Sequence, residues 1–130
     1  MRRAVSRKTL LLAICYHITL IALSIIPLSI IYPTSGPAAD ERMLNGADIP
    51  LHFIAYFTLT ILWRQAFLNS WESASVAVFT GGVLEIVQSV IPWRSFSVLD
   101  FLSNVVGVAT AISLAAIIKR RIASSLLPRA

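Results

Sequence analysis

Four long apolar stretches, each almost free of charged residues, constrain the fold of this chain more than any other feature of its sequence. We expect them to form helices at approximately 10–32, 51–68, 74–91 and 98–118. A helix needs about 20 residues to cross the roughly 30 Å of hydrocarbon in a bilayer, and each stretch approaches or meets that length. The prediction is an all-α membrane protein, in which a bundle of four transmembrane helices forms one domain over residues 1–130.

The composition points to the same class of protein. Hydrophobic residues make up 57% of the chain and charged residues only 13%, whereas soluble domains contain about 25% charged residues. The net charge of +5 comes mainly from basic residues near the two ends, and no basic face interleaved with aromatic residues is present. We therefore expect no nucleic acid as a partner and interpret the basic ends as topology signals and contacts with anionic lipids.

The positions of these basic residues also predict the orientation. They flank the first and last apolar stretches: Arg2, Arg3, Arg7, Lys8, Lys119, Arg120, Arg121 and Arg129. Basic flanks stay in the cytoplasm, and an even number of spans returns the chain to its starting side. We therefore expect a multi-pass protein of the bacterial cytoplasmic membrane with the N-terminus and C-terminus cytoplasmic. A cleaved signal peptide is the rival interpretation of the first stretch, although the apolar part of such peptides spans only about 7–15 residues.

Local patterns predict where several helices begin or bend. Pro27 lies inside the first stretch and is expected to kink the helix or to thin its outer end. Asn69 with Glu72, and Ser97 with Asp100, have the three-residue spacing of a capping box. Because carboxylates stabilise helix N-termini, capping is a structural interpretation of Asp100 and equally of Asp48.

Polar residues in or beside the last three stretches form the candidate binding site. They are Asp48, His52, Glu85, Gln88, Arg94, Asp100 and Asn104. Ionisable groups are costly in hydrocarbon, so their presence in spanning segments is a functional-site hypothesis. In the expected topology all seven lie in the outer third of the bilayer or above it, whereas the inner helix ends carry interfacial anchors.

Members of this set also have structural interpretations. Glu85 lies about two turns from its expected helix end, where no cap is needed, so an ion pair with Arg94 or a hydrogen bond to His52 is the alternative to a functional carboxylate. Gln88 and Asn104 are suited to hydrogen bonds between helices. Arg94 is suited either to an anion or to an interfacial position with its charge in water.

Metal ligation by His52, Glu85 and Asp100 is geometrically conceivable, but one histidine with carboxylates lacks the spacing of a zinc motif. We therefore expect no metal and no other cofactor.

Other residues are interpreted as packing elements. Cys15 is the only cysteine, so it has no intrachain disulfide partner. His17 is expected to make a polar packing contact within the bundle. Gly81, Gly82 and Gly107 are expected to let the third and fourth helices approach closely.

The motifs follow a definite order along the chain. An Asp is followed four residues later by His-Phe, then come a Gly-rich helix with Glu-x-x-Gln, Pro-x-Arg, and Ser-x-x-Asp-x-x-x-Asn-x-x-Gly. These positions are Asp48, His52, Phe53, Gly81, Glu85, Gln88, Pro92, Arg94, Ser97, Asp100, Asn104 and Gly107. The ordered set, over about residues 48–108, resembles the VanZ-like family of small bacterial integral membrane proteins. Family members often carry Lys directly after the first Asp, where this chain has Ile49.

The resemblance implies a multi-pass membrane fold and a role in the cell envelope. The family takes its name from a member linked to reduced susceptibility to a glycopeptide antibiotic, and related sequences accompany envelope polysaccharide functions; it implies no established reaction. We expect the outward-facing cluster to bind an anionic envelope lipid or lipid-linked glycan, with Arg94 and His52 contacting phosphate. Membrane lipids are the expected partners, and other membrane proteins or a homo-oligomer stay open.

Two further functions stay open beside this binding function. A membrane-embedded enzyme would use Glu85 and His52 as general acid and base on a lipid phosphate or glycosyl bond, with Arg94 stabilising negative charge. A purely structural subunit would use the cluster to hold the helices together. No nucleophile arrangement stands out, so the sequence identifies no catalytic residue and favours binding over catalysis.

Overall fold

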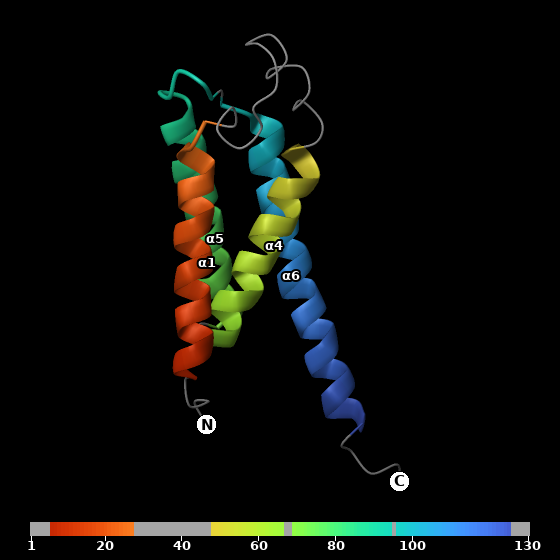
Figure 1. Cartoon of the computed structure of the whole chain (residues 1–130). Helices are drawn as coiled ribbons and strands as arrows, with labels where there is room; N and C mark the ends of the chain where they lie inside the picture. The colour runs from red at the N-terminus through yellow and green to blue at the C-terminus, as the bar shows by residue number, and fades with distance from the viewer. Residues whose placement is uncertain (1–5, 28–47, 67–68, 95, 126–130) are drawn as a thin grey trace.

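Four helices make up nearly all of the described structure. The computed structural model describes residues 6–27, 48–66, 69–94 and 96–125. The helices are α1 (Arg7–Ile25), α4 (Asp48–Ala66), α5 (Ser70–Gln88) and α6 (Val98–Ser125). They run alternately in opposite directions, so the beginning of α1 and the end of α6 lie at the same end of the bundle (Figure 1). The predicted all-helical fold with four helices in this order is confirmed, and the described ranges contain no strand.

The end of α1 differs from the prediction. The helix finishes at Ile25, and the extended residue Ile26 donates its N–H to the carbonyl of Ala22 at 3.1 Å. Proline disfavours helical geometry in the residue before it, so Pro27 follows the helix and does not kink it. The expected kink was wrong for this reason. Residues 28–32 of the predicted helix lie outside the described residues, so the alternative of a thinner outer end stays a prediction.

The start of α5 follows from a complete capping box. The side chain of Asn69 accepts the N–H groups of Trp71 and Glu72 at 2.9 and 3.0 Å, and the Glu72 carboxylate accepts the N–H of Asn69 at 2.9 Å. This predicted box is confirmed, and it starts the helix at Ser70, earlier than the expected residue 74.

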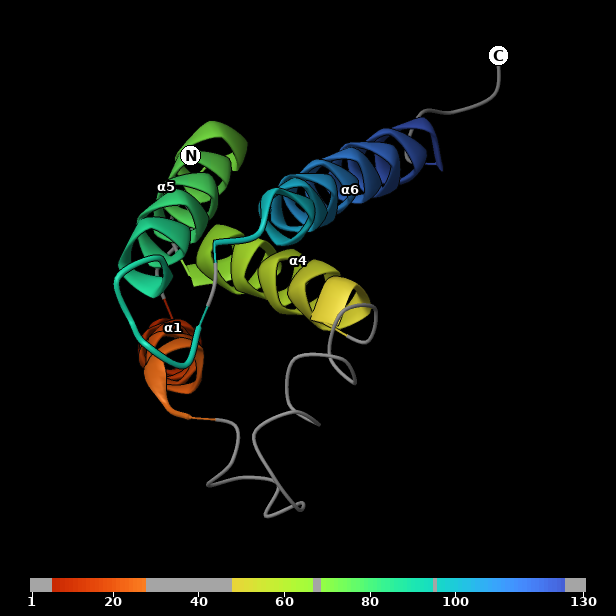
Figure 2. The same ribbon diagram turned by 90° about the horizontal axis from the view of Figure 1, so that it is seen from above.

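Helix α4 is the central element of the bundle. It packs against the other three helices, most extensively against α6 (Figure 2). Gly107 of α6 makes this contact close, because a Cβ atom there would collide with the carbonyl oxygen of Phe53 and lie 3.1 Å from the backbone nitrogen of Phe57. Gly107 was expected at the contact between the third and fourth helices, and this was wrong: it contacts α4. Gly81 and Gly82 do face side chains of α6.

A half-buried histidine joins three helices. Trp63 of α4 donates its indole N–H to Nδ1 of His17 in α1 at 3.2 Å. Nδ1 is therefore the acceptor, and Nε2 carries the proton that is donated to the Thr80 hydroxyl in α5 at 3.0 Å. The Thr80 hydroxyl donates in turn to the Val76 carbonyl at 2.8 Å. The packing interpretation of His17 is confirmed.

The bundle has an apolar core, but it also buries several polar side chains and exposes many large apolar ones, which is unusual in a soluble protein. Polar residues such as Thr60 and Ser73 are fully buried, whereas large apolar residues such as Phe79 and Val90 are more than 70% exposed. Two of the helices, α1 and α6, are long and apolar enough to cross a membrane. Only 11% and 33% of their most apolar windows are buried, so most of this apolar surface faces outward.

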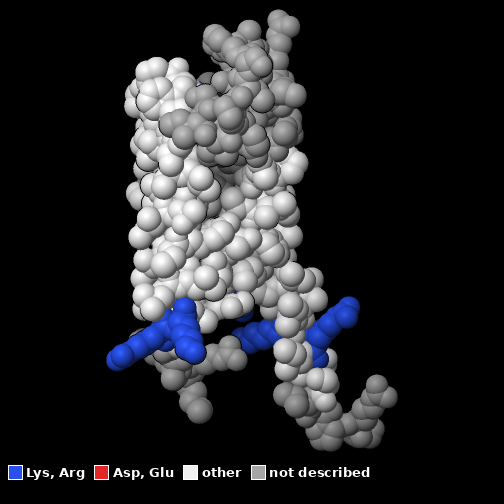
Figure 3. Space-filling view, viewed as in Figure 1, with Lys and Arg blue, Asp and Glu red and all other residues white. Residues whose placement is uncertain are grey.

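Charge is also distributed unevenly along the bundle axis. Lys and Arg side chains gather at the end where α1 begins and α6 finishes (Figure 3). Those turns contain Arg7, Lys8, Lys119, Arg120 and Arg121. The opposite end holds the α5–α6 connection and the beginning of α4 (Figure 1).

The glycine contacts predict opposite effects for two equivalent substitutions. Gly107→Ala should destabilise the protein by about 1–3 kcal/mol, because the added methyl group meets backbone atoms of α4 that cannot move aside cheaply. Gly82→Ala should be neutral or stabilising, because its methyl group would lie 3.6 Å from Phe101 and alanine favours a helix. Thermal unfolding of both variants in one mild detergent checks the prediction, and equal midpoints would contradict it.

Candidate functional site

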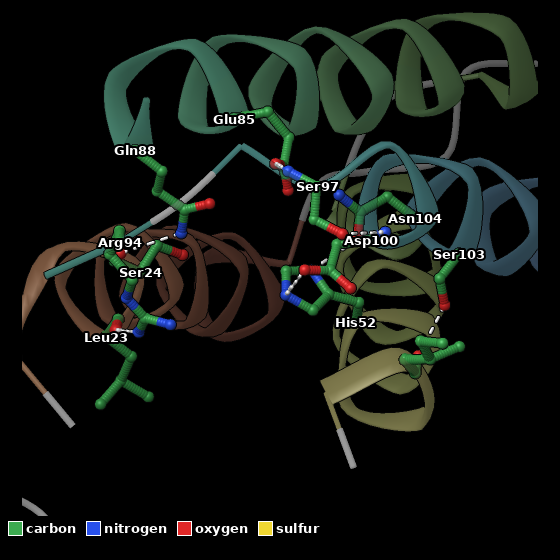
Figure 4. A network of polar contacts seen from close by, with 11 residues as sticks. Leu23, Ser24, His52, Glu85, Gln88, Arg94, Ser97, Asp100, Ser103 and Asn104 are labelled. Atoms are coloured by element: carbon green, nitrogen blue, oxygen red, sulfur yellow. Dashed lines mark hydrogen bonds and ion pairs between the residues drawn. The ribbon is translucent and has the colours of Figure 1, made fainter. Parts of the chain in front are cut away.

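Four of the seven predicted site residues come together at the end of the bundle opposite the basic residues. His52 lies near the beginning of α4, Glu85 near the end of α5, and Asp100 and Asn104 near the beginning of α6 (Figure 4). Asp48 is the first residue of α4, but its side chain lies outside the described residues. We refer to His52, Glu85, Asp100 and Asn104 as the polar cluster.

His52 is held by hydrogen bonding on one side and faces a carboxylate on the other. Its Nδ1 lies 3.0 Å from Oδ1 of Asn104. Because a carbonyl oxygen only accepts hydrogen bonds, the ring proton is on Nδ1. Nε2 then points to Oδ2 of Asp100, 3.8 Å away, a distance too long for a direct hydrogen bond. The side chains of His52 and Asp100 are 21% and 20% exposed, so a ligand can reach both.

Glu85 belongs to α5, but its carboxylate caps the beginning of α6. Its side chain is only 2% exposed, and Oε2 accepts the backbone N–H of Ser97 at 3.0 Å. In the predicted capping box that N–H would have bonded to the side chain of Asp100. Only half of the box forms, through the Ser97 hydroxyl, which accepts the N–H of Asp100 at 3.2 Å. The Asp100 carboxylate is thereby free to face His52.

Gln88 and Arg94 lie at the same end but contact α1. Three carbonyl groups near the end of α1 have no partner within the helix. The carbonyl of Leu23 accepts from Nη2 of Arg94 at 3.3 Å, and that of Ser24 accepts from Nε2 of Gln88 at 3.0 Å. The Ile25 carbonyl accepts the indole N–H of Trp93 at 3.1 Å. Gln88 and Arg94 thus cap α1, where a positive charge is also favoured by the helix dipole.

The expected ion pair between Glu85 and Arg94 does not form. Within the described residues, the ionisable side chains that approach to ion-pair distance are His52 and Asp100. The alternative expectation, a hydrogen bond between Glu85 and His52, is replaced by the bond from Ser97.

Two residues that support the cluster were missed or misread in the sequence. Ser97 was assigned only a capping role, although its N–H holds Glu85 in place. Ser103 was not singled out, and its hydroxyl donates to the Ile49 carbonyl at 2.6 Å, which ties α6 to the first turn of α4. A serine inside an apolar helix carries no signal that names its partner, so the sequence offered no way to identify this contact.

The cluster brings together donors from three helices. Nitrogen of His52 and carboxylate oxygens of Glu85 and Asp100 all lie within 4.8 Å of one another. An imidazole beside two carboxylates can transfer protons or hold a divalent cation. Zinc motifs are recognised by the spacing of ligands along one segment, and that criterion does not apply to ligands that come from separate helices. The expected absence of a metal stays a prediction.

Comparison with known proteins adds no relative to this description. No family model matches the chain, and neither the curated proteins nor the solved structures contain a match. The resemblance to the VanZ-like family therefore stays a prediction that depends on the order of the motifs.

The bond between Glu85 and Ser97 predicts different outcomes for two substitutions at one position. Glu85→Ala should leave the Ser97 N–H without a partner and destabilise the protein by about 1–3 kcal/mol. Glu85→Gln retains an acceptor oxygen and should change stability less. Hydrogen exchange measured by mass spectrometry should show faster exchange at the beginning of α6 in the alanine variant than in the glutamine variant. Equal exchange in the two variants would contradict the prediction.

Proposed function

We propose that this chain is a bacterial membrane protein with four spanning helices that binds the phosphate-bearing headgroup of an envelope lipid or lipid-linked glycan. The observation that carries the proposal is the polar cluster, which is partly open to ligands at one end of an otherwise apolar bundle.

We expect all four helices to span the membrane, although only two of them are apolar enough to be recognised as spans by themselves. α1 and α6 are long and apolar enough to span by themselves. α4 and α5 are 19 residues each, close to the length that a span requires. They run alongside α1 and α6 in the same bundle (Figure 1), so we expect them to lie at the same depth. The basic end would face the cytoplasm, which puts the polar cluster at the outer surface.

The surroundings of the cluster favour a lipid headgroup as the ligand. Large exposed apolar residues lie at the same end of the bundle, on α5, on α6 and directly after α5: Ile86, Leu99, Leu102 and Val90. A lipid would place its acyl chains against such residues and its headgroup at His52 and Asp100. Carboxylates accept hydrogen bonds from glycan or glycerol hydroxyls. His52 donates to phosphate in the form that carries a proton on Nε2, because its Nδ1 proton is already bonded to Asn104. Arg94 lies on the α1 side of the same end and has further N–H groups to donate.

One observation favours acid–base chemistry as a second candidate function. The imidazole of His52 is oriented by Asn104, and its other nitrogen faces Asp100 with Glu85 nearby. An oriented imidazole beside carboxylates is the arrangement that general acid–base catalysis uses. In this version the bound lipid phosphate or glycosyl bond would be cleaved or transferred.

The orientation predicts which ends of the helices are accessible from outside the cell. Single cysteines at Ser89 and Ser125, both exposed, would be introduced into a Cys15→Ser background. A membrane-impermeant maleimide should label Ser89→Cys in intact spheroplasts. It should label Ser125→Cys only after the membrane is permeabilised. The reverse pattern, or labelling of both positions in intact spheroplasts, would contradict the four-span orientation.

Lipid retention tests the ligand with two matched histidine variants. Wild-type protein purified in mild detergent should carry a phosphate-containing envelope lipid that mass spectrometry detects in stoichiometric amount. His52→Gln should reduce this lipid several-fold, because the group that contacts phosphate is lost. His17→Gln makes the same change inside the bundle, away from the cluster, and should retain the lipid.

Three outcomes separate the candidate functions. Equal lipid in all three proteins would overturn headgroup binding at the polar cluster. Loss only in His52→Gln supports binding. Release of a headgroup from added lipid by wild-type protein, absent in His52→Gln, favours the second candidate, catalysis.

A further inference from the structure

The geometry points to a divalent metal ion, of which Zn²⁺ matches best, bound between His52, Glu85 and Asp100. The inference deepens the proposed function, since an ion there would be the group that meets the lipid phosphate, and its phosphate-binding part rests on that proposal. Ion binding itself is testable without any lipid.

The donor atoms are of the types that bind zinc, and they lie close together. One imidazole nitrogen and two carboxylate oxygens lie within 4.8 Å of one another. Ligand atoms about 2.1 Å from one tetrahedral ion lie about 3.4 Å apart, and the His52 Nε2–Asp100 Oδ2 distance is 3.8 Å. Small side-chain movements bring the set to coordination distance.

His52 is oriented as a metal-binding histidine would be. Asn104 Oδ1 accepts from Nδ1, which leaves the lone pair of the neutral ring on Nε2. That lone pair points at a carboxylate oxygen 3.8 Å away, an arrangement that a cation between the two atoms stabilises. Metal-binding histidines are oriented in this way by a hydrogen bond from the nitrogen that does not bind the metal. Asn104 is only 1% exposed and holds the ring firmly.

Glu85 is only 2% exposed, and one of its two carboxylate oxygens is left for a further ligand. One oxygen accepts the Ser97 N–H, and in the described part of the chain the other accepts no hydrogen bond. The side chain is directed to the side of α5 on which Asp100 and His52 lie (Figure 4). That second oxygen keeps its lone pairs available, and a metal ion between the three side chains would use them.

Charge gives a further argument. Two carboxylates close together in apolar surroundings repel each other strongly. Arg94 does not reach Glu85 or Asp100 to form an ion pair, because its guanidinium is turned to the end of α1. A divalent ion neutralises both carboxylates and leaves His52 as a neutral ligand.

The number of ligands suggests what the ion would do. Metal sites with three protein ligands keep an open position for water or substrate. The partial exposure of His52 and Asp100 puts that open position on the accessible side of the cluster. A phosphate oxygen of a headgroup is a suitable ligand for it, which explains how a cluster rich in carboxylates would accept an anion.

The test is metal binding by the full chain in detergent. Protein stripped with a chelator would be titrated with ZnCl₂ by isothermal calorimetry, and Co²⁺ would serve as a spectroscopic probe of coordination. We expect one ion per chain. Asp100→Asn and Glu85→Gln should each weaken binding about tenfold or more. Glu72→Gln is the matched control, since it removes a carboxylate at the opposite end of α5 and retains its cap.

Asp100 is partly exposed and its side chain does not cap α6, so Asp100→Asn is expected to fold even where Glu85→Gln does not. Absence of one-to-one binding in the wild-type protein would overturn the inference. Equal affinity in the wild-type and Asp100→Asn proteins would also overturn it.

Lipid retention measured with and without chelator separates the two proposals. One-to-one ion binding without any retained lipid supports the ion and overturns headgroup binding. Retained lipid in a protein that binds no ion overturns the ion and supports headgroup binding. Lipid that is lost on chelation and restored by Zn²⁺ supports both.

Discussion

The hydrogen bond from the Ser97 N–H to the Glu85 carboxylate organises the end of the bundle that carries the polar cluster. It joins the end of α5 to the beginning of α6 across the connection between them. In a complete capping box the Asp100 carboxylate would accept this N–H, and here Glu85 accepts it instead. The backbone N–H of Asp100 still donates to the Ser97 hydroxyl, and the Asp100 carboxylate is directed to His52. One buried carboxylate thus positions a second, more exposed one, and this is why both approach the same imidazole.

An apolar exterior makes interior polar contacts obligatory. A polar group without a partner is costly in an apolar interior, and several such groups pair across helices: Tyr16 with the Ala55 carbonyl, His17 with Thr80 and Trp63, and Asn104 with His52. Such contacts between helices contribute only about 0.6 kcal/mol each. Their main effect is on register, because a helix displaced by one residue would leave several groups unpaired. Close packing at Gly107 sets the distance between α4 and α6 within which this register is possible.

The sequence predicted how far along the bundle each polar residue lies better than it predicted which neighbouring helix that residue contacts. The alternation of helix directions places His52, Glu85, Asp100 and Asn104 at one end, and the structure brings these four together. The same reasoning included Gln88 and Arg94, which lie at that end but contact α1. Position around the axis depends on side-chain packing, which a hydropathy pattern does not specify. The contact of Gly107 with α4 and the Ser103–Ile49 bond were missed for the same reason: each depends on a specific neighbour in space. The end of α1 before Pro27 is different, because it follows from a local effect of proline on the preceding residue. The Asn69–Glu72 box was predictable because all of its partners lie within four residues.

The position of Arg94 changes the chemistry open to the polar cluster. An arginine beside Glu85 would have made a neutral, self-contained pair and a direct site for phosphate. With that guanidinium directed to the carbonyls of α1, the described residues around Glu85 and Asp100 offer only the imidazole of His52 as a partner of opposite charge. An anionic headgroup that approached the two carboxylates directly would be repelled. A ligand for this site must therefore bring positive charge, bring hydroxyl donors, or bind together with a cation, and a lipid phosphate satisfies the last condition only when a metal ion or a protonated His52 lies between it and the carboxylates.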